Sequence, residues 1–204
     1  YSVYQFLQSP KLEGGRENGL YLDKSHSDIE LLTACIQYLT IENISASSIP
    51  EEVEAALKDD DLYISPEVFS NTPFLQHAVS NWPAYASKLP DAKLKDMWTS
   101  VLLPFFEPSS NHFRFWVRKA RYLHGYYKYP PGITPIHVAA IHGLPGLARI
   151  LLEDSHLSKA TWQVSKAKTG SRTPLHMAIE NGQNSVIDLL LELDLIDSTD
   201  ERGR

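Results

Sequence analysis

Apolar residues recur at helical spacing through most of residues 1–128. Within 27–39 they stand three or four positions apart, and Ser27-Asp28 before them is typical of a helix start. A short amphipathic segment at 3–7 and a glycine-rich loop at 10–19 come first. The same pattern predicts further helices at 48–57, at 72–82 ending before Pro83, at 91–103 ending before Pro104, and at 112–127.

Two segments near the C-terminus repeat one another. The 19 residues from Thr134 align without gaps with those from Thr173, which lies 39 residues later. Each segment predicts a helix, a turn and a second helix, because Thr is a good N-cap, Pro suits a first turn, and a later Gly suits the left-handed residue that ends a helix. The second helices carry an apolar face that one unit cannot bury, so the units must stack. These apolar positions are Leu147, Ile150 and Leu151 in the first unit and Val186, Leu189 and Leu190 in the second.

The sequences TPIHVAAIHG (134–143) and TPLHMAIENG (173–182) resemble the T-P-L-H-x-A motif of the ankyrin repeat. The resemblance implies helical units stacked into a solenoid, in which the motif His bonds to nearby backbone and has no catalytic or metal-binding role. The residues that receive this structural role are Thr134, Pro135, His137 and Gly143 in the first unit and Thr173, Pro174, His176 and Gly182 in the second.

The same resemblance implies protein recognition by a rigid concave face with variable side chains. The corresponding positions are Pro131, Ile133, Ile141 and His142 in the first unit and Thr169, Arg172, Glu180 and Asn181 in the second.

The connection between the two units is longer than the resemblance leads us to expect. An ankyrin unit has about 33 residues, so the spacing of 39 indicates an enlarged loop at 153–172. Trp162 in this loop is either an aromatic anchor for a partner or a side chain packed under its own loop.

Three further segments resemble, in the same order, the region that precedes the ankyrin array in fungal NACHT-type nucleotide-binding proteins. They are SVYQFL at 2–7, the His26…Cys35-Ile36-x-Tyr38-Leu39 helix, and PFLQHA…WP at 73–83. This resemblance implies an upstream nucleotide-binding switch, a longer downstream array, and a role in innate immunity or self/non-self recognition.

These resemblances suggest a division of the chain. Residues 1–40 end a winged-helix or helical region, 41–128 form a helical linker or cap, and 129–204 hold repeats at about 130–170 and 171–204. Residues 200–204 look like the start of a further unit. Because the chain starts at Tyr1, we expect a fragment, a processed chain or a trimmed piece. Since about three repeats are usually needed for stability, we expect the array to continue beyond Arg204. If Arg204 is the natural end, the helices before 129 must cap the array.

Charge is unevenly distributed along the chain. The net charge of the 204 residues is −6, yet residues 111–172 hold 10 basic and 2 acidic side chains. In the predicted helix 112–127, Arg114, Arg118 and Arg121 share a face opposite the aromatic residues. An alternative function is therefore nucleic-acid binding by the segment 112–172, which would weaken steeply with salt. Because the aromatic residues fall on the inward face, docking of an acidic protein segment is the preferred interpretation.

Motifs for catalysis and for cofactor binding are absent. The sequence contains no G-x-x-x-x-G-K-[ST], G-x-G-x-x-G, G-x-S-x-G or H-E-x-x-H. The carboxylates at 59–61 lack the alternation of a calcium loop. Cys35, the single cysteine, lies on an apolar stripe, so we expect a buried structural thiol. We expect no enzyme, no metal and no cofactor; a catalytic site assembled from distant residues would need a pocket of converging titratable groups.

No apolar run approaches the ~20 residues that span a bilayer, and no secretory signal is visible. A single cysteine is in keeping with a reducing compartment. We therefore expect a protein of the cytoplasm, with the nucleus as the alternative location. The sequence thus predicts an all-α chain with a helical region followed by an ankyrin solenoid. Its predicted function is non-catalytic protein–protein interaction in an intracellular receptor or signalling protein.

Overall fold

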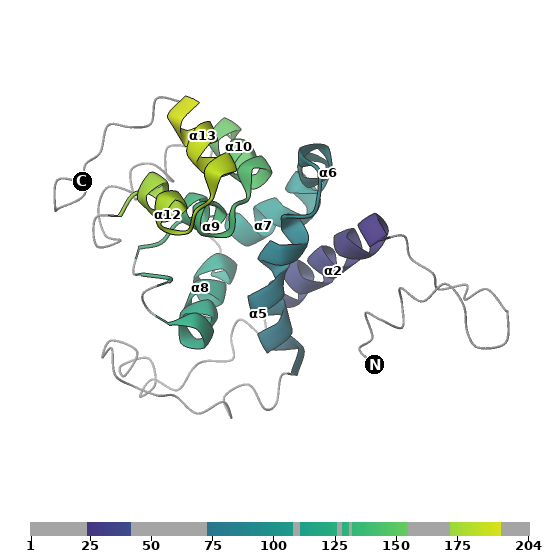
Figure 1. The fold of residues 1–204 in the computed structure, drawn as a ribbon. Coiled ribbons are helices and arrows are strands. Elements are labelled where there is room, and N and C mark those ends of the chain that lie inside the picture. Colours follow the sequence, from purple (N-terminus) through teal and green to yellow (C-terminus); the bar gives the residue numbers. More distant parts are fainter. Residues whose placement is uncertain are drawn as a thin grey trace, which may run out of the picture.

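The computed structural model describes residues 24–41, 73–107, 111–125, 128–130, 132–154 and 172–192. Every element in these ranges is a helix, as Figure 1 shows, so the all-α prediction is confirmed for them. The predicted segment 3–7, the loop 10–19, the helix 48–57 and the carboxylates 59–61 lie outside the described residues. The elements are α2 (Lys24–Leu39), α5 (Pro73–Ala86), α6 (Asp91–Asp96), the π-helix η2 (Trp98–Leu102), α7 (Leu103–Phe106), α8 (His112–His124), α9 (Pro135–His142), α10 (Pro145–Glu153), α12 (Pro174–Glu180) and α13 (Asn184–Glu192).

Helix α2 begins earlier than the sequence predicts. Ser27 and Asp28 were expected to precede the helix, but α2 starts at Lys24 and both side chains are buried inside its first turns. The Asp28 carboxylate lies 3.0 Å from the ammonium of Lys88, just past the end of α5. The carboxylate therefore attaches α2 to the α5 segment and does not cap the helix. Of the predicted apolar stripe, Leu32, Cys35, Ile36 and Leu39 are buried as expected, and Ile29 is half-buried.

Helix α5 continues through Pro83, before which the sequence pattern predicts its end, and reaches Ala86. A proline inside a helix has no N–H for the carbonyl four residues earlier, which here is that of Val79. The indole Nε1 of Trp116 on α8 donates a hydrogen bond of 3.0 Å to the Val79 oxygen. A side chain from a distant helix thus satisfies the carbonyl that Pro83 leaves open.

The helix predicted at 91–103 consists of three short helices and extends to Phe106. The π-helix η2 separates α6 from α7, and Pro104 falls in the first turn of α7, where a missing N–H costs little. The chain therefore passes Pro104 and buries Phe105 and Phe106 against Trp82. These rings form the aromatic centre of the helical region.

Helix α8 joins the helical region to the repeats. It ends at His124, three residues before the predicted end, and Gly125 follows as its C-cap with φ of 89°. Its aromatic face is buried as predicted, but the opposite face is not simply solvated. Arg114 is exposed, whereas Arg121 is half-buried and donates to the carbonyls of Tyr129 at 2.7 Å and Pro130 at 3.2 Å.

The two repeat units have the predicted internal structure. Helices α9 and α10 form the first unit, and α12 and α13 form the second. Helix α12 packs on α9, and α13 packs on α10. The apolar faces predicted for the second helices are buried at Leu147, Ile150, Leu151, Val186, Leu189 and Leu190.

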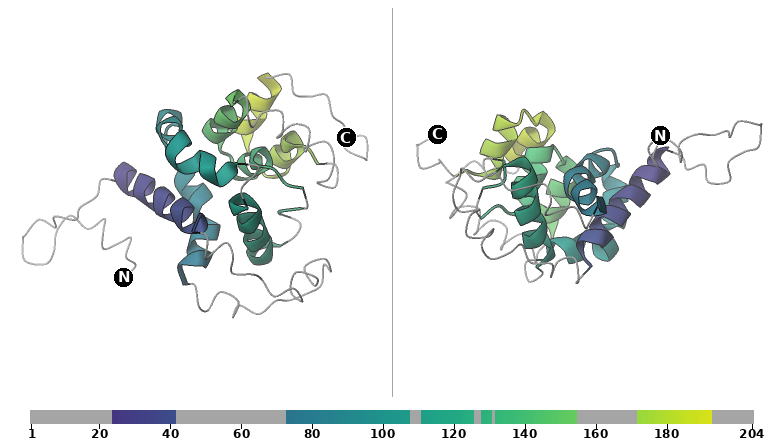
Figure 2. Two further views of the ribbon diagram at one scale, coloured as in Figure 1. Left: turned by 180° about the vertical axis from the view of Figure 1, so that it is seen from behind. Right: turned by 90° about the horizontal axis from the view of Figure 1, so that it is seen from below.

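The helical region covers the free side of the first unit. Helix α6 packs on α10, and Lys95 Nζ lies 3.3 Å from Glu153 Oε2. The indole Nε1 of Trp98 donates to Asp154 Oδ2 at 3.0 Å. Both views in Figure 2 place α2 and the pair α12–α13 on opposite sides of the molecule. The first unit thus lies between the helical region and the second unit.

Candidate protein-binding surface

The first T-P-x-H motif connects the two repeat units through His137. Its Nδ1 accepts hydrogen bonds from the Thr134 backbone N–H at 3.3 Å and the Thr134 hydroxyl at 2.7 Å. Its Nε2 donates to the carbonyl of Arg172 at 3.1 Å. Burial lowers the pKa of His137 to about 4, although the bond to Arg172 acts in the opposite direction. The imidazole is therefore neutral at pH 7 and holds the start of the second unit against the first.

The second motif repeats this local geometry. The Nδ1 of His176 accepts from the Thr173 backbone N–H at 3.2 Å and from its hydroxyl at 2.6 Å. The His176 backbone N–H donates to the Thr173 hydroxyl oxygen at 3.3 Å. Both Thr residues are N-caps and both following prolines lie in the first helical turn. Both histidines thus make the hydrogen bonds expected of a structural role.

Two glycines in left-handed conformation end the first helix of each unit. Gly143 has φ of 63° and Gly182 has φ of 65°. A Cβ at Gly143 would overlap the side-chain carbonyl of Gln183, whereas a Cβ at Gly182 would meet no atom within 4 Å. Gln183 donates from Nε2 to the carbonyl of Ile141 at 3.3 Å, which ties the ends of α9 and α12 together.

Replacing Gly143 by alanine should cost more stability than replacing Gly182. Both changes force an L-residue into the left-handed region, which costs about 1–2 kcal/mol. Only Gly143→Ala also displaces Gln183 from its hydrogen bond, which adds about 1 kcal/mol. Urea denaturation of the two variants checks this difference, and equal losses would contradict the role given to Gln183.

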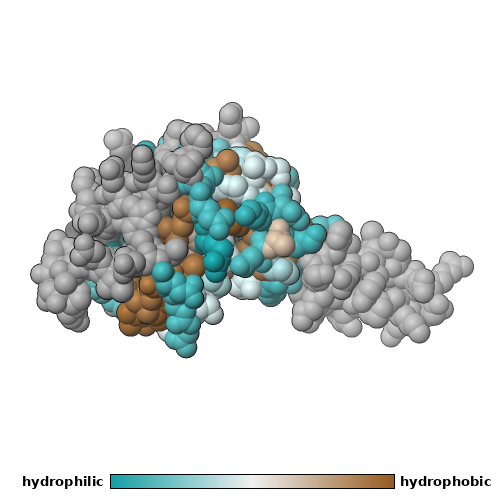
Figure 3. Space-filling model, turned by 90° about the horizontal axis from the view of Figure 1, so that it is seen from above, coloured by the Kyte–Doolittle hydropathy of each residue, from teal (hydrophilic) through white to brown (hydrophobic). Residues whose placement is uncertain are grey.

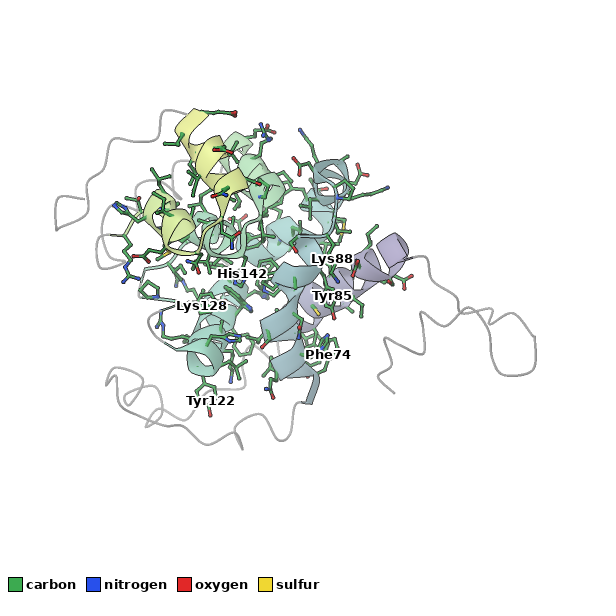
Figure 4. All side chains as sticks on the ribbon, viewed as in Figure 1. Phe74, Tyr85, Lys88, Tyr122, Lys128 and His142 are labelled. Atoms are coloured by element: carbon green, nitrogen blue, oxygen red, sulfur yellow. The ribbon has the colours of Figure 1, made fainter. Side chains whose placement is uncertain are left out.

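His142, predicted to contact a partner, is held at the junction with α8. Its Nε2 and the hydroxyl of Tyr129, which is itself buried, share a hydrogen bond of 2.7 Å. Burial lowers the pKa of His142 to about 3, and the nearby Lys128 and His124 act in the same direction. Figure 4 shows His142 and Lys128 on the side of the repeats that faces α8. His142 is neutral at pH 7 and half-buried, so it offers a partner part of a ring and no charge.

The second unit presents polar side chains along α12. The guanidinium of Arg172 lies 3.3 Å from the carboxylate of Glu180, at the other end of the helix. Asn181 is exposed and its Nδ2 donates to the carbonyl of Met177 at 2.8 Å. Arg172, Glu180 and Asn181 thus share the accessible edge of α12, which we call the α12 edge.

Other residues predicted to bind a partner have different positions. Ile133 and Ile141 are buried in the core, so neither presents its side chain to a partner, and this corrects the prediction for both. Ile141 holds the same position in the first unit as the exposed Glu180 holds in the second. Ile141 is buried because the first unit is packed between the helical region and the second unit. Pro131, Thr169 and Trp162 lie outside the described residues.

Sequence reasoning missed two residues that shape this region. Tyr129 lies just before the first motif, and its ring meets Trp116 at 5.4 Å between centroids. Gln183 stands where the first unit has Leu144. A polar residue at a position that is apolar in the other unit was the signal that could have identified it. Nothing local in the sequence distinguished Tyr129 from the other tyrosines near it.

Residues 117–200 match the family model described as Ankyrin repeats (3 copies). Residues 117–200 carry ankyrin repeats. Ankyrin repeats are generally protein–protein interaction modules and non-catalytic scaffolds. No curated protein and no solved structure matches the chain. The match begins within α8, before the predicted boundary at 129, and it leaves out the segments that carry the NACHT-type resemblance.

The described residues limit other kinds of site. Their helices include none that is long and apolar enough to cross a bilayer. Within the same ranges, no three His, Cys, Asp or Glu side chains are grouped so that they could hold a metal ion. Cys35 is fully buried, and burial raises the pKa of its thiol to about 12, so the predicted buried thiol is confirmed.

Proposed function

We propose that the ankyrin segment recognises a protein partner through the α12 edge, with His142 beside it. The observation that supports this best is the Arg172–Glu180 ion pair, which is accessible and set on a rigid frame. The frame consists of two capped helices that His137 and Gln183 tie together across the units. A rigid surface with variable polar side chains loses little conformational entropy when it binds.

The charges of the α12 edge favour a partner that carries both signs. Arg172 and Glu180 neutralise one another in the free chain. A partner with an acidic and a basic group at matching spacing can pair with both, and this arrangement fixes its orientation more than its affinity. Pro131, Thr169 and Trp162 stay predicted contact residues outside the described part of the chain.

The test is capture of proteins from an extract of the source organism, followed by measurement of Kd for each captured protein. The double variant Arg172→Ala/Glu180→Ala keeps the net charge and should weaken binding of the true partner at least tenfold. Arg149→Ala/Glu192→Ala is the matched control, because it removes one exposed charge of each sign from α10 and α13. Equal affinity of parent and R172A/E180A for every captured protein would contradict the proposal.

Nucleic-acid binding receives less support from the geometry. Phe113 and Trp116 on α8 are buried, so their rings are closed to base stacking. Arg121 already donates to two backbone carbonyls. We therefore propose that the partner is a protein and that the function is binding, not catalysis.

We also propose that the chain belongs to an intracellular receptor of the NACHT type, in the cytoplasm or the nucleus. Two of the segments that resemble NACHT-type proteins support this proposal. They are the segment from His26 to Leu39, on α2, and the segment 73–83, on α5. These two helices pack together, and the rings of Tyr38 and Phe74 meet edge to face at 5.1 Å. Sequencing the complete coding region tests the proposal, because it requires a G-x-x-x-x-G-K-[ST] loop upstream.

A further inference from the structure

Three basic side chains surround the ring of Tyr129, where α8 meets the first repeat unit. The Lys128 Nζ lies 5.6 Å from the centre of this ring. The rings of His124 and His142 each lie 6.1 Å from it between centroids. Lys128 and His142 are labelled in Figure 4. The fold therefore brings basic side chains from the end of α8, the segment after it and the end of α9 to one place. We call His124, Lys128, Tyr129 and His142 the Tyr129 cluster.

The basic side chains of the Tyr129 cluster reach the surface, although Tyr129 itself is buried. His124 is exposed, and Lys128 and His142 are half-buried. The His124 Nε2 also shares a hydrogen bond of 3.3 Å with the hydroxyl of Ser80 on α5. Hydrophilic side chains cover much of the described surface in the view of Figure 3, so accessible basic side chains alone do not make a site.

The cluster differs from the rest of this surface because the elements that form it carry no carboxylate. Residues 108–152, which include α8 and α9, contain no Asp or Glu, and neither does α5. In the part of the chain that the structure describes, no carboxylate lies within ion-pairing distance of a basic side chain of the cluster. The Glu180 carboxylate of α12, which packs on α9, pairs with Arg172.

The positive charges of the cluster are unfavourable when no anion is bound. Partial burial lowers the pKa of Lys128 and that of His124, and the charge of Lys128 lowers the pKa of His124 further. Arg121 brings another cation next to Tyr129, to whose carbonyl it donates. An anion at this place would offset both the burial of the charges and their mutual repulsion.

A phosphate group suits this arrangement better than a carboxylate does. A phosphate monoester carries about −1.5 to −2 charges at pH 7 and has three strong acceptor oxygens, whereas a carboxylate carries a single charge. Lys128 offers an ammonium with three donors, and the imidazole of His124 offers an N–H from another element. Charge-assisted hydrogen bonds from two elements to one group are the strong ones in proteins.

We propose that the Tyr129 cluster is a binding site for a phosphate group, which Lys128 and His124 contact directly. His142 and Tyr129 form the inner wall of the site, where they share their hydrogen bond of 2.7 Å. The site uses no residue of the α12 edge, so its test is independent of the partner-binding surface proposed above.

The test is an NMR titration of the full chain at pH 7 and constant ionic strength, with inorganic phosphate and N-acetyl phosphoserine amide as probes. Either probe should shift the imidazole C–H signals of His124, which the His124→Gln variant assigns. The phosphoserine probe should bind at least about fivefold more tightly than N-acetyl aspartate amide, which carries one charge. Of the two phosphate probes, the one with the lower Kd identifies the source of the group, a phosphorylated side chain or phosphate itself.

Lys128→Gln should weaken the binding of both phosphate probes about tenfold, because it removes the ammonium. Lys93→Gln is the matched control, since Lys93 is exposed on α6 and pairs there with Asp96 at 3.7 Å. It should change Kd by less than about twofold. The variant Arg172→Ala/Glu180→Ala should leave phosphate binding unchanged, which separates this site from the α12 edge.

The titration of His124 adds a readout that binding elsewhere would not change. A bound anion favours the charged imidazole, so saturating phosphate should raise the pKa of His124 in the parent. The proposal would be overturned by the absence of a saturable shift at His124, by equal losses in Lys128→Gln and Lys93→Gln, or by aspartate amide binding as tightly as the phosphoserine probe. Binding of a single-stranded oligonucleotide that depends on Lys128, without binding of either phosphate probe, would assign the cluster to a nucleic acid instead.

Discussion

Replacing Trp116 by alanine is expected to lower the free energy of unfolding by about 3–5 kcal/mol, enough to unfold much of a marginally stable domain. The side chain is fully buried, and its ring meets those of Trp82 and Tyr129, each at 5.4 Å between centroids. It thus packs against the helical region on one side and the start of the repeats on the other. Circular dichroism during urea denaturation measures the loss.

Trp116→Phe isolates the indole hydrogen bond from most of the packing. Phenylalanine keeps an aromatic ring but leaves the Val79 carbonyl without a donor, which costs about 1–3 kcal/mol. Pro83→Ala restores a backbone N–H four residues after Val79. It should therefore stabilise the Trp116→Phe variant by about 1 kcal/mol more than it stabilises the parent, where the indole already occupies the carbonyl. Additive effects, within about 0.5 kcal/mol, would contradict this account.

The same pair of residues explains why the end of α5 could not be predicted from the sequence. A proline normally ends a helix when no group replaces its missing N–H. The replacement comes from Trp116, and local patterns contain no information about a donor on another helix. The boundaries of α9 were predicted correctly because Thr134 and Gly143 act within the helix they delimit.

The exposure of the residues predicted to contact a partner was harder to predict than the helix ends, for a related reason. A motif gives a residue's position within its unit, but exposure depends on what lies on either side of that unit. Ile141 and Glu180 hold the same position, yet Ile141 is buried and Glu180 is accessible. The first unit lies between the helical region and the second unit, and that arrangement was not readable from the motif.

Replacing His137 by alanine is expected to cost about 3 kcal/mol, because it opens a cavity and leaves polar groups of Thr134 and Arg172 without partners. His176→Ala is the control, since it removes the same local hydrogen bonds from a side chain that is only half-buried. Its cost should be clearly smaller. Equal costs in urea denaturation would show that the bond to Arg172 contributes nothing.

The pH dependence of stability provides an independent test of the neutral imidazole. The pKa of His137 is lowered from 6.5 to about 4 in the folded chain, so between these values the unfolded chain binds a proton that the folded chain does not. Stability is therefore complete above about pH 6.5 and is lost as the pH falls toward 4, by an amount on the order of 3 kcal/mol.

The sign follows from the hydrogen bonds of His137. Its Nδ1 accepts from the Thr134 N–H, and a proton on Nδ1 would set two donors against each other. His137→Ala should flatten the plot of unfolding free energy against pH by about one proton in this window. His142, whose pKa is lowered to about 3, keeps its own contribution in both chains, so a residual slope is expected. An unchanged slope in the variant would mean that His137 titrates normally and does not join the two units as a neutral imidazole.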